Sequence, residues 1–326
     1  MAEQKALPHK YDNVPRKIAE TLIGYESKYF RECKPVPFCG LEIYPVTVRE
    51  YEEFLTCLDV LTVNRKATGA GLMKTDLGYA ISLMTAEGDA GKTFSIKFQQ
   101  LMCMVFHFEN GIKCKKCGNL MAFSSPEWHN YLKSVMEAIS ANSQEMPPLE
   151  CPKCKTAGKD DFAEMIRVSD SPERGKERLF INGHEITPDD YALLRYIVPF
   201  QNMPDYRDDS GVDPVLKKDF EAKAEMEAKK RGGVTTPLER KVIALSLSAP
   251  YKAEEIYGMP LRTFNMMYSM MRGKMDYLVT KLGLTTGLVS LKEGQSLDDW
   301  VSEKDEDMYA GVYKDLSQQS KEMGIK

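Results

Sequence analysis

Residues 114–118 read Cys-Lys-Lys-Cys-Gly and residues 151–154 read Cys-Pro-Lys-Cys, and these two short stretches decide how the middle of the chain folds. Two residues between a pair of cysteines let one tight turn direct both sulfurs at one ion. Two such turns complete a tetrahedral set of four sulfurs, which suits Zn²⁺. The sequence therefore predicts a zinc site with the ligands Cys114, Cys117, Cys151 and Cys154.

The expected site is closed, because four protein ligands leave no position for water, and a closed zinc site is structural. The interval 118–150 is longer than a minimal zinc ribbon requires. A helix that starts at Ser125 and Pro126 accounts for the excess. His129 lies on this inserted helix and is not assigned as a ligand. Zinc here would replace a hydrophobic core that so small a module cannot build.

The composition is that of an ordinary soluble protein. The 326 residues carry 44 basic and 48 acidic side chains, with a net charge of −4. This balance argues against a general nucleic-acid coat, although it leaves room for a local basic patch. No apolar run reaches the roughly 18 residues that span a bilayer, and no signal peptide is expected. In a reducing cytosol, the eight cysteines would be thiols or metal ligands rather than disulfides.

Helical periodicity dominates the first third of the chain. Helices are predicted over 13–32, 47–61 and 72–86, and over a stretch after Lys92. Residues 38–46 predict a short strand. Thr47 and Glu50 form a capping box at the start of the second of these helices.

The remainder of the chain is predicted from turn and cap signals. Asn182-Gly183 indicates a two-residue hairpin turn, and Thr187-Pro188 indicates the start of a helix. Residues 199–214 predict a loop. Asp213-Pro214 would open a highly charged helix that stops at Gly232-Gly233. Further helices are expected over the ranges 237–248, 252–257 and 260–282.

The predicted fold class is mainly α with a small β-rich zinc-ribbon module, an α+β chain of several domains. The expected boundaries are 1–110 for an N-terminal helical domain and 111–186 for the zinc ribbon with its inserted helix and a β-hairpin. A C-terminal helical domain over 187–290 and a polar tail over 291–326 would follow.

Residues 86–93 match a relaxed phosphate-binding loop, A-x-x-x-x-G-K-T. Such a loop needs a buried strand before it, and the preceding residues have helical character instead. Ala86 also replaces the first glycine. The favoured interpretation is a helix–turn–helix connection with Gly88 and Gly91 in the turn. The alternative, an enzyme that uses this loop, remains as a third hypothesis.

Residues 252–275 admit two interpretations. A short helix, Gly258 and a second helix resemble a helix-turn-helix, but the second helix presents methionines and aromatics rather than cations. Methionine-rich faces suit the docking of other protein segments. The expected partner-binding side chains are Tyr257, Met259, Arg262, Phe264, Met267 and Met271.

Two stretches together resemble a known family. The sequence LLRYIVPFQNMPDYRDDSGVDPVLKKDFE (193–221) is similar to a "QN-x-P-D-Y…D-P-x-L" segment, and residues 236–279 resemble the helical region that follows it. The family comprises baseplate hub and tail-assembly proteins of contractile-tailed bacteriophages, and the resemblance covers roughly residues 193–290. It implies a virion protein, made in the host cytoplasm, that binds other tail proteins. It implies no catalytic residues.

Three functions follow as hypotheses. The first is a non-enzymatic structural or assembly protein of a phage tail baseplate, either in the virion or as an assembly chaperone absent from it. The second is a zinc-ribbon factor that binds nucleic acid or acts in transcription, against which the net acidity argues. The third is the enzyme described above. No membrane partner is expected, and self-association into a homo-oligomer is left open.

Overall fold

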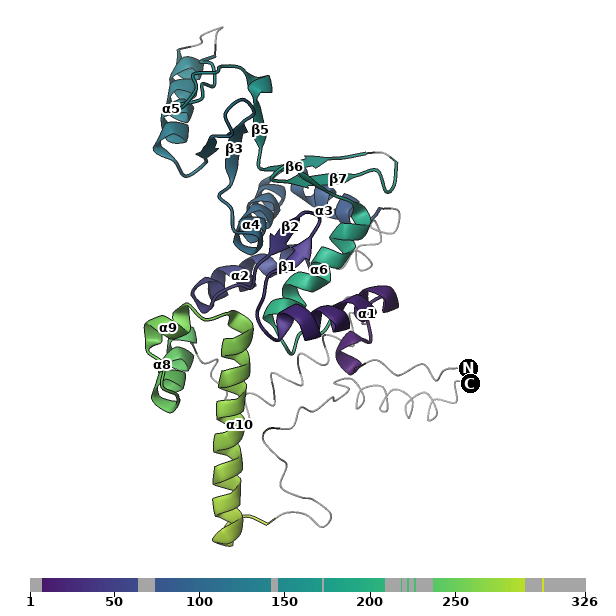
Figure 1. Ribbon diagram of the computed structural model, residues 1–326, viewed down its shortest axis with the longest axis vertical. Coiled ribbons are helices and arrows are strands. Elements are labelled where there is room, and N and C mark those ends of the chain that lie inside the picture. The colour runs from purple at the N-terminus through teal and green to yellow at the C-terminus, as the bar shows by residue number, and fades with distance from the viewer. Residues whose placement is uncertain are drawn as a thin grey trace, which may run out of the picture. The chain divides into compact units, whose positions relative to one another are not determined.

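The structure is a computed structural model. It describes residues 8–63, 74–141, 146–171, 173–208 and 237–290, and the single positions 218, 222, 226 and 301 (Figure 1). The chain forms two compact units. Unit 1 comprises Met1–Lys34, Pro45–Glu52 and Tyr196–Lys326, and unit 2 comprises Pro35–Tyr44 and Glu53–Arg195.

The predicted domains over 1–110, 111–186 and 187–290 are consecutive along the chain, whereas each of the two units combines separate segments of it. Segments from both ends of the chain pack together in unit 1, where Arg262 reaches Glu26. The polar tail over 291–326 lies outside the described residues, apart from Val301.

Helices make up most of the described chain. Their bounds are α1 (Arg16–Tyr25), α2 (Tyr51–Cys57), α3 (Asp76–Met84), α4 (Asp89–Phe106), α5 (Pro126–Ser140), α6 (Pro188–Asn202), α8 (Leu238–Ser248), α9 (Ala253–Tyr257) and α10 (Leu261–Thr285). A π-helical turn over Glu26–Phe30 continues α1, and 3-10 turns cover His9–Tyr11, Val48–Glu50, Leu58–Val60 and Lys159–Asp161.

The strands form small antiparallel sheets, all of them within unit 2. Their bounds are β1 (Val36–Phe38), β2 (Leu41–Ile43), β3 (Gly111–Cys114), β4 (Leu120–Ala122), β5 (Phe162–Glu164), β6 (Ile166–Ser169), β7 (Arg178–Ile181) and β8 (His184–Ile186). The strand orders are β1-β2, β4-β3-β5 and β6-β7-β8. The prediction of a mainly helical α+β chain is confirmed at this level.

Aromatic side chains form the centre of unit 1. The rings of Tyr11 and Phe200 stack with centroids 5.1 Å apart, and Tyr206 meets Phe200 edge-on at the same distance. Phe30 and Phe264 are fully buried in the same unit. Such rings bury large apolar areas, so they dominate the packing energy of this core.

Helices α8 and α9 lie beside the N-terminal end of α10 in unit 1 (Figure 1). Leu261 and Phe264 anchor this end of α10 and are fully buried. The N–H of Leu261 also donates to the carbonyl of Val46 at 2.7 Å. Buried side chains and backbone bonds therefore hold α10 at its start.

Local capping and turn signals are confirmed. Thr47 and Glu50 form the predicted capping box before α2. The N–H of Thr187 donates to the carboxylate of Asp190 at 3.1 Å, which caps the start of α6. Asn182 and Gly183 join β7 to β8 with φ of 49° and 83°. These are the positive φ values that a two-residue hairpin turn needs.

Two element predictions are wrong. Residues 38–46 do not form one strand, because Cys39 and Gly40 turn the chain with φ of 47° and 77° and split it into the β1–β2 hairpin. The loop predicted from Pro199 begins later, since α6 continues to Asn202. The charged helix predicted from Asp213 lies outside the described residues, except for positions 218, 222 and 226.

The phosphate-loop match is a connection between two helices. Helix α3 ends at Met84 and α4 begins at Asp89, so a helix rather than a strand precedes the turn. Gly88 caps α4 with φ of 93°, a conformation that favours glycine. The helix–turn–helix interpretation is confirmed.

Gly91→Ala should destabilise this connection. A Cβ at position 91 would lie 2.0 Å from the backbone oxygen of Ala86, and a backbone atom cannot swing aside. We expect a loss of about 2 kcal/mol or more in the free energy of unfolding, typical of steric overpacking. Urea denaturation followed by circular dichroism measures it. Gly24→Ala, in α1 with open space around the new methyl group, is the control and should be neutral or slightly stabilising. If Gly91→Ala and Gly24→Ala changed the free energy of unfolding by the same amount, the close packing described at Gly91 would be wrong.

Candidate metal centre

The four cysteines lie in a small part of unit 2, which we call the four-cysteine module: β3, β4, β5, α5 and the turn at 149–158. Cys114 is the last residue of β3, the central strand of its sheet. Gly111 starts this strand, where the backbone of β4 lies very close. A Cβ at position 111 would lie 2.3 Å from the backbone oxygen of Met121, so only glycine fits. The sheet thus holds the first cysteine of the site in a fixed position.

The two cysteine turns have the same backbone geometry. In the first, the N–H of Gly118 donates to the carbonyl of Cys114 at 2.9 Å. In the second, the N–H of Lys155 donates to the carbonyl of Cys151, also at 2.9 Å. Gly118 and Lys155 both have positive φ, of 70° and 57°.

A second hydrogen bond is repeated as well. The N–H groups of Cys114 and Cys151 donate to the carbonyls of Asn119 and Thr156, each at 2.9 Å. Each turn therefore closes on itself through two bonds, and the repetition shows that both CxxC segments form the same local structure.

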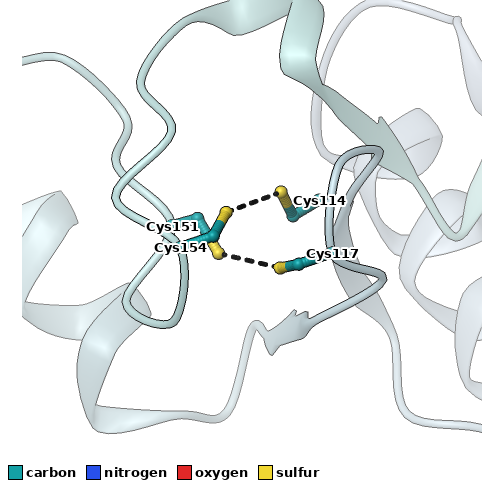
Figure 2. A group of neighbouring side chains, drawn as sticks. All are labelled: Cys114, Cys117, Cys151 and Cys154. Atoms are coloured by element: carbon teal, nitrogen blue, oxygen red, sulfur yellow. Dashed lines mark hydrogen bonds between the residues drawn. The ribbon is translucent and has the colours of Figure 1, made fainter.

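The four sulfurs converge on one point between the turns (Figure 2). The Sγ atoms of Cys114 and Cys154 lie 3.6 Å apart, as do those of Cys117 and Cys151. All four Sγ atoms lie within 4.8 Å of one another. No pair is close enough for a disulfide, whose sulfurs are about 2 Å apart.

This geometry fits a tetrahedral metal ion. A Zn–S bond of about 2.3 Å in a tetrahedron places the sulfurs about 3.8 Å apart, inside the observed range. Thiolates are soft ligands that select zinc or iron over hard cations such as Mg²⁺. The four cysteines can thus bind a metal ion such as zinc.

Hydrogen bonds prepare one thiol for ionisation. The side chain and backbone of Thr156 lower the pKa of Cys154 to about 6. A backbone hydrogen bond from Asn119 also lowers the pKa of Cys117, but burial and the neighbouring cysteines raise it to about 12. Without metal, Cys154 therefore loses its proton near neutral pH, whereas Cys117 resists losing its proton.

The sulfurs also form part of the module's core. Cys114 and Cys151 are fully buried and pack with Ile112, Met121 and Phe162. Around them, half-buried apolar side chains complete the cluster: Cys117, Phe123, Trp128, Leu149 and Cys154. So small a core supplies little hydrophobic stabilisation alone, which is typical of modules that a metal holds together.

Two further polar residues, His129 and Thr156, lie in the four-cysteine module. His129 lies on α5, where its Nδ1 is 2.7 Å from the backbone oxygen of Ser125, so it is occupied within its own helix. Thr156, which the sequence reasoning missed, contacts the Sγ of Cys154 at 3.2 Å. Its only signal in the sequence is its position two residues after the last cysteine.

The predicted docking residues do not form one exposed face. Arg262 and Phe264 are buried inside unit 1, at 5% and 1% exposure, so these two side chains are not available to a partner and their assignment is corrected. They are buried because α10 starts against the core of unit 1. The remaining four are half-buried: Tyr257, Met259, Met267 and Met271.

Comparison with protein-family models, with curated proteins and with solved structures gives no match for this chain. Among the described residues, none of the helices combines the length and the apolar character that crossing a bilayer requires.

Proposed function

We propose that the four-cysteine module is a zinc ribbon and that its ion is structural. The observation that carries this proposal is the pair of matched turns, whose four sulfurs leave no ligand position for water or substrate. Zinc bound in this way contributes its binding free energy to folding. It does no chemistry on a substrate.

We further propose that the chain is a non-enzymatic structural or assembly protein of a contractile phage tail. The closed metal site supports a non-catalytic role. The resemblance of residues 193–290 to baseplate hub and tail-assembly proteins supports the particular assembly. Unit 1 carries most of those residues, and it also exposes apolar side chains on α10 that suit contacts with other proteins.

Two measurements test these proposals separately. Elemental analysis of the purified protein should find about one zinc per chain, and a content near zero would remove the zinc ribbon. Mass spectrometry of purified virions should find the chain among the tail proteins. If it is absent from virions but bound to tail proteins in infected cells, the assembly-chaperone alternative replaces the virion role. If it is absent from both, the tail proposal fails.

A nucleic-acid-binding role is the second candidate, because lysines surround the cysteine turns. Five of them are exposed: Lys113, Lys115, Lys116, Lys153 and Lys155. Part of this charge is already used, since Lys115 donates to the carbonyl of Asp160 and Lys155 pairs with Glu150 at 3.7 Å. DNA binding that weakens steeply with salt would support this candidate. No binding at low salt would remove it.

A further inference from the structure

Among the described residues, the large side chains of helix α10 that are buried lie at its beginning. Leu261, Arg262 and Phe264 are buried in unit 1, whereas farther along the helix the apolar side chains of Met275, Leu278 and Leu282 are 57%, 47% and 65% exposed. Val279 is 66% exposed beside them. Isolated exposed apolar side chains are ordinary, but a continuous row on one helix indicates an interaction surface.

The row has the spacing of a coiled coil. Tyr268, Met271, Met275, Leu278 and Leu282 follow one another at intervals of three, four, three and four residues. This alternation averages 3.5 residues and places every member on one narrow stripe, the a and d positions of a heptad repeat. We call these five residues the α10 seam.

We propose that the α10 seam pairs with the α10 seam of a second copy of this chain, in a parallel coiled coil. The surface is self-complementary, because two identical stripes can each supply the knobs and the holes of the other. This inference does not depend on the zinc site or on the phage-tail role.

The flanking charges favour a second copy in the parallel orientation. Parallel pairing places Lys274 opposite Val279 and Lys281 opposite Thr286 of the other copy, so no like charges meet. Antiparallel pairing in register would place Lys274 opposite Lys281 twice. Like charges at these flanking positions disfavour a pairing.

The seam has defined ends. At its start, the ring of Tyr268 stacks on Phe264 and joins the packing of unit 1. At its end, Gly287 turns the chain with φ of 73°, and the N–H of Leu288 donates to the carbonyl of Gly283, which stops the helix. The more exposed part, residues 271–282, spans about 17 Å. So short a seam predicts a weak dimer, with a Kd on the order of 10 μM.

Sedimentation equilibrium of the full zinc-loaded chain tests the pairing. Wild type should be dimeric at about 100 μM, and Met275→Lys or Leu278→Lys should raise the Kd at least about tenfold. Met270→Lys is the matched control, because Met270 is 42% exposed on the same helix but lies off the seam. Its Kd should equal that of wild type. Circular dichroism of each variant checks that the fold is retained.

Lys274→Glu tests the orientation. In the parallel pair its partner is apolar, so the Kd should change by less than about threefold. A markedly tighter dimer would show that Lys274 faces Lys281 of the other copy, and the parallel arrangement would be wrong.

Two results would overturn the pairing itself. One is a chain that stays monomeric at about 100 μM. The other is a dimer that the seam variants leave unchanged. If the chain is monomeric and its melting temperature falls in Met275→Lys but not in Met270→Lys, the seam is covered by the chain's own residues.

Discussion

Cys151→Ser should abolish zinc binding and unfold the four-cysteine module. The variant leaves three sulfurs, which no longer complete the site. Apart from its cysteines, the buried core of the module consists of Ile112, Met121 and Phe162, so the module depends on the binding free energy of the ion for its stability. We expect the module to lose several kcal/mol of stability, enough to unfold it at room temperature. Limited proteolysis should show new cleavage within residues 111–164, and elemental analysis should show the loss of zinc.

Cys33→Ser is the matched control. Cys33 lies in unit 1, its Sγ is 3.1 Å from the hydroxyl of Thr263, and serine can keep that contact. This variant should retain full zinc content and the wild-type cleavage pattern. If Cys151→Ser also kept both, the four sulfurs would not be the ligands of a structural ion.

Lowering the pH provides a second route to the same state. Zinc binds thiolates, so protons compete with the metal for the four sulfurs. Hydrogen bonds with Thr156 hold the pKa of Cys154 near 6, so this ligand keeps its negative charge down to that pH, whereas the pKa of Cys117 is raised. The four-cysteine module should therefore become sensitive to protease as the pH falls below about 6, and wild-type resistance should return when the pH and zinc are restored.

Arg262→Met should give the largest loss of stability in unit 1. The guanidinium is 5% exposed and donates from Nη2 to the Oε1 of Glu26 at 3.0 Å and from Nη1 to the carbonyl of Phe200 at 2.8 Å. The substitution removes one of the positive charges that pair with the half-buried carboxylate of Glu26. It also removes the hydrogen-bond donor to the backbone carbonyl of Phe200. Removing one partner of a buried ion pair costs about 3 to 5 kcal/mol. Urea denaturation followed by circular dichroism measures the loss.

An exposed pair in the same unit is the control. Arg49 and Glu254 form an ion pair with side chains 64% and 81% exposed. Exposed pairs are screened by water and salt, so Arg49→Met should cost less than about 1 kcal/mol. Similar losses in both variants would mean that burial does not distinguish the two pairs.

The same network predicts a dependence on pH. Burial raises the pKa of Glu26, but the hydrogen bond and charge of Lys10, with Tyr11 and Arg262, outweigh this and lower it. A carboxyl with a lowered folded pKa stabilises the fold above its unfolded pKa, and this contribution is lost as the pH falls through the folded value. Arg262→Met should weaken that dependence, because one of the cations that lower the pKa is gone.

The candidate metal site could be predicted from sequence because its signal is local. Each CxxC segment closes its own turn, through bonds that join Cys114 to Gly118 and Asn119, and Cys151 to Lys155 and Thr156. What the sequence could not show is that the two turns meet. That depends on β3 and β5 pairing in register, with Cys114 opposite Phe162.

The element predictions succeeded and failed for the same physical reason. Caps such as Thr47 with Glu50 and turns such as Asn182-Gly183 depend on bonds between residues at most three apart. The β1–β2 hairpin was missed because its turn at Cys39 puts a non-glycine residue at positive φ. That conformation is unusual for cysteine and leaves no signal in a propensity pattern.

The sequence by itself determined the helices and the closed turn of each CxxC segment, since these depend on contacts between near neighbours. Only the tertiary structure decided which residues share a unit, and that Arg262 and Phe264 belong to a core rather than to a docking face. Arg262 and its partner Glu26 are 236 positions apart. Burial at such separations is the sum of many weak contacts, and no short pattern in the sequence encodes that sum.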